Sequence, residues 1–120
     1  MTGARILVVE DEFLIRLTLA EALTDDGFTV IEAGDGAAAL RAFEAAPDVA
    51  LLLTDLNLPG GLDGGEVARC VRQIRPSLPV IYITGQPEGP ETPSSPRDAI
   101  IVKPYLPSEV CAAVRRMIGT

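Results

Sequence analysis

Short apolar runs alternate along this chain with segments that carry apolar residues at helical spacing. The runs are almost wholly hydrophobic, as expected for strands that are covered on both faces of a sheet. They comprise residues 5–9, 28–32, 49–54, 79–84 and 98–103. Phe28–Glu32 alternates more than the others and predicts an edge strand, whereas the near-continuous hydrophobicity of Val49–Thr54 predicts a strand at the centre of the sheet.

Helical segments lie between and after these runs. The expected helices span about 12–25, 35–46 and 65–74, and a last one begins near Pro107. Gly27 and Pro47 mark the ends of the first two, and Asp35 is a suitable cap for the second. Alternation of strand and helix implies right-handed crossovers, and so an α/β fold with a doubly wound parallel sheet in three layers.

One stretch departs from this alternation. Gly85–Pro96 contains four prolines and two glycines. A proline inside a helix costs about 3 kcal/mol because it removes an amide donor and clashes with the preceding turn. We therefore predict a solvated loop here, with a fourth helix that is short or absent.

The composition is that of one ordinary globular domain spanning residues 1–120, with 48% hydrophobic and 22% charged residues. Apolar stretches such as Val49–Leu53 are far shorter than the roughly 20 residues that span a bilayer, so we expect a cytoplasmic protein without a membrane partner. The net charge of −7 disfavours direct nucleic-acid binding but suits a divalent cation. Cys70 and Cys111 are expected to be buried thiols on helices rather than a disulfide.

Polar residues stand at the ends of four of the predicted strands. Glu10 and Asp11 follow the first, Asp55 the third, Thr84 ends the fourth and Lys103 ends the fifth. The carboxyl ends of parallel strands share one edge, which is where such folds place their ligand crevice. We therefore expect these side chains to converge on one pocket.

These residue types suit phosphoryl transfer. The carboxylate of Asp55 can act as metal ligand, base or nucleophile, and the like charges beside it favour a divalent cation such as Mg²⁺ in an open, all-oxygen site. Lys103 and Thr84 can neutralise charge on a transferring phosphoryl group. The set predicts Mg²⁺-dependent phosphorylation of Asp55 itself.

Each residue taken alone has an ordinary structural explanation. An acidic pair after a strand commonly caps a helix, a role open to Asp11 or Glu12. Thr84 and Lys103-Pro104 equally suit a plain strand end and a turn. The prediction therefore depends on the ordered set, in which each residue type stands at the end of the appropriate strand.

With this set of residues the chain resembles the response regulator receiver domain, the chemotaxis-type phosphoacceptor module of two-component signalling. The resemblance covers essentially the whole chain, through the motifs at 8–12, 53–66, 82–85 and 102–105. It implies a flavodoxin-like fold with strand order 2-1-3-4-5. Tyr82-Ile83-Thr84-Gly85 is similar to a subgroup of stand-alone receivers with a degenerate fourth helix.

The resemblance also assigns roles around the metal. Asp55 would accept phosphate from the phosphohistidine of a histidine kinase or histidine phosphotransfer protein. Asp11 and Asp55 would bind Mg²⁺ directly, Asn57 would contribute its backbone carbonyl, and Glu10 would act mainly through water.

Further roles concern the phosphoryl group. By resemblance, Thr84 and Lys103 would contact its oxygens, Lys103-Pro104 would be a cis peptide, and Asn57 and Gln86 would match positions that tune its lifetime. Such a domain catalyses only its own phosphorylation and dephosphorylation, so we do not expect an enzyme with other substrates.

Three features depart from the family pattern. Ile100 stands where receivers usually carry an aromatic switch residue, the loop after Asp55 has an extra glycine in Gly60-Gly61, and the proline-rich segment replaces most of the fourth helix, which belongs to the output face.

Three functions follow as hypotheses. The first is a binding module whose partner affinity depends on phosphorylation of Asp55. The second, suggested by Ile100 and the proline-rich segment, is a phosphate sink or a phosphorylation-independent scaffold. The third is a haloacid dehalogenase-like phosphatase, whose pattern has a second Asp two residues after the nucleophile, where this chain has Asn57.

Overall fold

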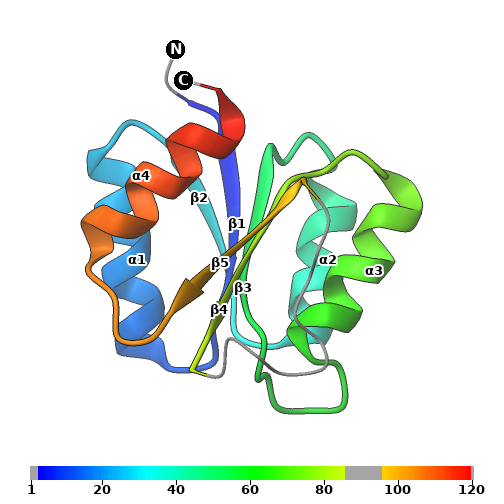
Figure 1. Ribbon diagram of the computed structural model, residues 1–120. Helices are drawn as coiled ribbons and strands as arrows, with labels where there is room; N and C mark the ends of the chain where they lie inside the picture. The colour runs from blue at the N-terminus through cyan, green and yellow to red at the C-terminus, as the bar shows by residue number, and fades with distance from the viewer. Residues whose placement is uncertain (1–2, 86–95, 120) are drawn as a thin grey trace.

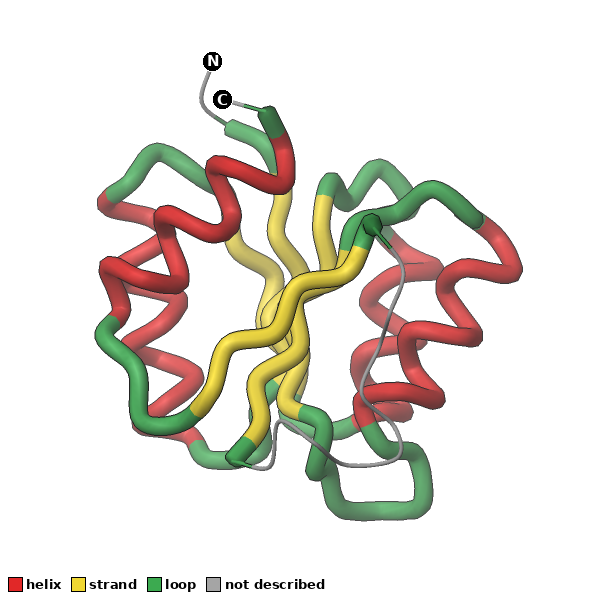
Figure 2. The backbone as a smooth tube through the Cα atoms, viewed as in Figure 1, coloured by secondary structure: helices red, strands yellow, loops and turns green. Residues whose placement is uncertain are grey.

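Each apolar run of the sequence forms a parallel strand in the computed structural model, which describes residues 3–85 and 96–119. The single sheet has the order β2-β1-β3-β4-β5 (Figures 1 and 2). In chain order the elements are β1 (Arg5–Val9), α1 (Phe13–Asp25), β2 (Thr29–Ala33), α2 (Gly36–Ala45), β3 (Leu51–Asp55), α3 (Gly64–Ile74), β4 (Val80–Thr84), β5 (Asp98–Val102) and α4 (Pro107–Ile118).

This arrangement confirms the predicted α/β class and strand order. β3 lies at the centre and is buried throughout, whereas β2 and β5 are the half-exposed edges. Element ends differ from the predictions by one or two residues; β3, for example, extends to Asp55. The predicted loss of a helix between β4 and β5 concerns residues that lie largely outside the described ranges.

Two helices cover each face of the sheet because alternate strand residues point to opposite sides. α1 and α4 pack on one face and α2 and α3 on the other (Figures 1 and 2). Ile6 and Val8 of β1 belong to the core beneath α1 and α4, and Leu7 and Val9 belong to the core beneath α2 and α3.

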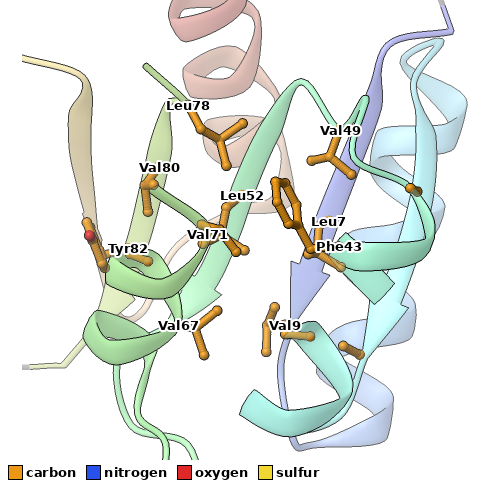
Figure 3. Packing of buried hydrophobic residues seen from close by; sticks show 14 of the residues in the cluster. Leu7, Val9, Phe43, Val49, Leu52, Val67, Val71, Leu78, Val80 and Tyr82 are labelled. Carbon is orange, nitrogen blue, oxygen red and sulfur yellow. The ribbon is translucent and has the colours of Figure 1, made fainter. Parts of the chain in front are cut away.

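The core beneath α2 and α3 is centred on an aromatic ring. Phe43 of α2 is 1% exposed and lies beside Leu7, Val49 and Leu52 (Figure 3). Burying a side chain of this size contributes roughly 1.5–3 kcal/mol. Ile74 is 62% exposed because it is the last residue of α3 and lies at the end of the helix.

The two cysteines are both free thiols, which agrees with the prediction that they form no disulfide. Cys111 is buried against the core beneath α1 and α4, and burial raises the pKa of its thiol. Cys70 is only partly buried, so the prediction of two buried thiols was wrong for this residue. Its position on α3 falls between the core face and the exposed face.

The loop between β3 and α3 is held at both ends. Asp63 and Glu66 form a capping box, with the side chain of each accepting a hydrogen bond of 2.9 Å from the other's backbone N–H. The N–H of Gly64 donates to the carbonyl oxygen of Leu56 at 3.0 Å. A Cβ at Gly64 would lie 2.2 Å from the carbonyl oxygen of Asp55, so only glycine permits this approach.

We predict that Gly64→Ala destabilises the protein by about 2–3 kcal/mol, because the backbone of Asp55 cannot move away without disturbing β3. Gly65→Ala is the matched control, since its Cβ would meet its nearest neighbour at 3.4 Å, an ordinary contact. We expect this control to be neutral or slightly stabilising. Urea denaturation of both variants tests the prediction, and equal stabilities would contradict it.

Candidate functional site

Asp55 lies at the end of the central strand, with its carboxylate facing the sheet edge where the strands end. The residue is 3% exposed. Its Oδ1 accepts a hydrogen bond of 2.8 Å from the backbone N–H of Asn57, and its Oδ2 lies 2.7 Å from the Nζ atom of Lys103. Both carboxylate oxygens are therefore oriented by donors from the neighbouring loop and from the end of β5.

Lys103 reaches Asp55 from the residue that directly follows β5. Its backbone N–H donates to the carbonyl oxygen of Thr84 at 2.9 Å, which fixes the start of the side chain. Burial lowers the pKa of the ammonium, but the hydrogen bond to Asp55 and the charges of Asp55 and Glu10 outweigh it and raise the pKa. Lys103-Pro104 is a cis peptide, as the resemblance implied.

Glu10 directly follows β1 and is almost fully buried, at 2% exposure. Its Oε2 accepts a hydrogen bond of 3.0 Å from the backbone N–H of Glu12, whereas its Oε1 is buried without a hydrogen-bond partner among the described residues. The pKa of Glu10 is raised to about 7, chiefly by burial. The charge of Asp55 and the contacts with Asp11 and Asp55 raise the pKa further, whereas the hydrogen bond from the N–H of Glu12 lowers it.

Carboxylate oxygens of Glu10, Asp11 and Asp55 lie within 4.8 Å of one another. Such close like charges favour a cation, and Oε1 of Glu10 has no hydrogen-bond partner among the described residues that would compete with a metal ion. Asp11 is exposed, which leaves the cluster open on one side. The donor set fits a hard divalent cation that keeps some of its waters, such as Mg²⁺.

Glu12 is the N-cap residue of α1, but its side chain makes no capping hydrogen bond. The backbone N–H of Glu12 donates instead to the side chain of Glu10. Helix capping by Asp11 or Glu12 therefore does not account for the acidic pair.

The three other predicted residues are Thr84, Asn57 and Gln86. Thr84, at the end of β4, is 3% exposed and adjoins Asp55 through the pairing of β3 with β4. Asn57 is exposed and contributes its N–H to Asp55. Gln86 lies outside the described residues.

The structure adds two features that the sequence analysis did not single out. Arg16 of α1 donates a hydrogen bond of 2.9 Å to the carbonyl oxygen of Glu10. Tyr105, with Lys103, lines a groove of about 480 Å³ between α1 and the start of α4. The sequence shows an arginine five residues after Asp11, but its contact with Glu10 becomes apparent only in the folded structure.

Comparison with known proteins agrees with this geometry. The family model for the response regulator receiver domain matches residues 6–115. The chain belongs to this family. As a receiver domain of two-component systems it has a phosphoacceptor role, in a family that uses Mg²⁺ at an acidic pocket.

Two curated relatives and one solved structure illustrate the similarity. The receiver domain is 35% identical to the response regulator receiver protein CpdR of Brucella abortus, covering 95% of this chain and 96% of that protein. It is 30% identical to the sensor kinase CckA of the same organism, covering 97% of this chain but 13% of the kinase. A response regulator receiver protein from Sinorhizobium medicae has a TM-score of 0.87 at 28% identity, covering 98% of this chain and 96% of that one.

Among the described residues of the receiver domain, no helix combines the length and the apolar character that crossing a bilayer requires.

The raised pKa of Glu10 predicts a pH-dependent stability. In the unfolded chain Glu10 releases its proton near pH 4.5, whereas the folded, metal-free protein keeps it until about pH 7. Unfolding therefore releases a proton in this window, and rising pH favours the unfolded chain. Glu10→Gln keeps an acceptor for Glu12 and removes this effect.

We expect Glu10→Gln to gain stability over the natural chain as pH rises through that window, reaching about 1–2 kcal/mol near pH 8. Urea denaturation in EDTA at several pH values measures the difference. Glu44→Gln, at an exposed position on α2, is the control and should show no such trend. A stability difference that is independent of pH would contradict the role of Glu10.

Proposed function

We propose that Asp55 accepts a phosphoryl group from the phosphohistidine of a histidine kinase or histidine phosphotransfer protein, in the presence of Mg²⁺. The observation that carries this proposal is the 2.7 Å contact of Lys103 with a buried carboxylate whose other oxygen is held by the N–H of Asn57. Glu10, Asp11 and Asp55 would hold the metal, together with the backbone carbonyl of Asn57.

The reaction forms a bond between a carboxylate oxygen of Asp55 and phosphorus while the bond from phosphorus to the donor histidine nitrogen breaks. When bound, Mg²⁺ supplies positive charge beside the phosphoryl oxygens. The ammonium of Lys103 leaves Asp55 to bind a phosphoryl oxygen, and the hydroxyl of Thr84 donates to another. Hydrolysis of this aspartyl phosphate reverses the change, so the domain turns over only its own phosphate.

An apolar surface beside the site suits a donor protein. Phe13, Leu14 and Leu106 are 59%, 72% and 64% exposed, and they lie at the start of α1 and just before α4. The groove between these elements includes Leu14 and Lys103. We infer that the donor docks here, since exposed apolar residues grouped around a reactive site commonly mark an interface.

The packing of Ile100 bears on how phosphorylation of Asp55 would change the rest of the protein. Ile100 of β5 packs against the core beneath α2 and α3, opposite Tyr82 of β4. Its side chain has no aromatic ring or hydroxyl that could change position when Thr84 moves. This observation favours the second candidate function, a phosphate sink or phosphorylation-independent scaffold, over a switch that acts through position 100.

A haloacid dehalogenase-like phosphatase has little support. Asn57 has no carboxyl group with which to act as an acid or base, and the family assigned to the chain is the receiver domain.

We predict that Asp55→Asn abolishes phosphorylation, because an amide oxygen does not form a stable acyl phosphate. With acetyl phosphate and Mg²⁺, the mass increase of one phosphoryl group should be lost completely. Asp48→Asn is the control, since the side chain of Asp48 is 69% exposed and remote from the site in the fold. Persistent labelling of Asp55→Asn would refute the assignment.

The switch and the scaffold differ in how far beryllofluoride changes the protein. A switch predicts amide NMR shifts that extend from the site through β5 to the first turn of α4, because Lys103 and Thr84 move inward. A scaffold or sink predicts shifts confined to the residues around Glu10, Asp55, Thr84 and Lys103. Shifts that reach Val110, at the end of that first turn, would rule out the scaffold, and a confined pattern would rule out the switch.

A further inference from the structure

The loop that carries Glu10 and Asp11 is tied to the fold by a side chain outside the acidic cluster. Arg16, in the first turns of α1, donates from Nη1 to the carbonyl oxygen of Glu10 at 2.9 Å. Its Nε lies 3.0 Å from Oε1 of Glu32 on β2. Its side chain is 18% exposed, so the guanidinium is largely enclosed.

The surroundings of the guanidinium restrict its position. The carbon at its centre lies 5.5 Å from the ring centroid of Phe13, a cation–π distance. A Cβ at Gly34 would lie 3.3 Å from Nη1, so the backbone at Gly34 passes close to the group. Arg16 is therefore held by α1, β2 and the segment after β2 together.

The bond to Glu10 acts on the backbone of the acidic loop. The carbonyl of Glu10 belongs to the peptide that joins it to Asp11, so fixing its direction fixes where the backbone of Asp11 begins. The N–H of Glu10 donates to the carbonyl oxygen of Ala33 on β2 at 3.1 Å. Both backbone groups of Glu10 are thus bound, one by β2 and the other by Arg16.

We propose that Arg16 is a positioning residue for the metal ligands, which sets the peptide between Glu10 and Asp11 so that Asp11 faces Asp55. This inference rests on the proposed Mg²⁺ site. Asp11 is exposed, so its side chain is confined less by packing than those of Glu10 and Asp55. The direction of its backbone therefore has a large influence on where its carboxylate lies.

The ion pair with Glu32 has a secondary role. Glu32 is more exposed than Arg16, with 38% of its side chain accessible, and exposed pairs of this kind contribute little. The hydrogen bond to the Glu10 carbonyl is the contact that reaches the site. The two contacts can be separated by mutation, since Glu32→Gln removes the charge of one partner and leaves the other contact in place.

The test is a Mg²⁺ titration followed by amide NMR, with the melting temperature measured in parallel. Arg16→Met should weaken Mg²⁺ binding about tenfold, the lower end for groups that orient metal ligands. Arg16→Lys keeps a donor for the Glu10 carbonyl and should restore most of the affinity. Glu32→Gln should remain within about twofold of the natural chain.

Arg41→Met, at an exposed position on α2, is the matched control and should bind Mg²⁺ normally. If Arg16→Met does not fold, Arg16→Leu, which also lacks a donor, takes its place with the same expected loss. A folded Arg16→Met protein with normal Mg²⁺ affinity, even at a lower melting temperature, would overturn the inference. So would equal losses for Arg16→Met and Glu32→Gln, because the ion pair would then be the important contact.

The outcome also separates this inference from the proposed function. If the natural chain itself fails to bind Mg²⁺, the proposed metal site is wrong and the role of Arg16 falls with it. If the natural chain binds Mg²⁺ and Arg16→Met binds it equally well, only the role of Arg16 is wrong.

Discussion

The contact between Asp55 and Lys103 is the interaction on which the site depends. A carboxylate with 3% exposure would cost several kcal/mol if it had no partner. Here one oxygen is bound by an ammonium and the other by the N–H of Asn57. The ammonium belongs to Lys103, which follows β5, and β4 lies between β5 and β3. The strand order therefore brings the positive charge that stabilises the buried carboxylate of Asp55 at the end of β3.

Glu10, unlike Asp55, is a buried carboxyl group whose surroundings disfavour its charged form. Its burial and the charge of Asp55 raise its pKa to about 7, and one of its oxygens is without a hydrogen-bond partner among the described residues. This arrangement opposes folding of the metal-free protein while it provides the negative charge that a cation requires. Local conflict of this kind is expected where function, rather than stability, determines the residues.

The edge of the sheet at β5 is built differently from the site. β5 is an edge strand whose start is anchored by Arg72 at the end of α3, which lies 2.7 Å from Asp98 and donates to the carbonyl oxygen of Leu78. Further along β5, Ile100 packs opposite the buried ring of Tyr82. The aromatic ring at this level of the sheet thus belongs to β4.

The sequence by itself determined the elements and the membership of the site. Continuous apolar runs identify strands that are covered on both faces, and a polar residue where such a run ends has to emerge at the shared edge, so Asp55, Thr84 and Lys103 could be grouped without a structure. Only the tertiary structure decided the contacts between segments that are distant in sequence. The bond from Arg16 to Glu10, the exposure of Leu14 and Ile74, and the approach of Gly64 to Asp55 depend on how helices pack against the sheet, and local periodicity carries no information about that packing.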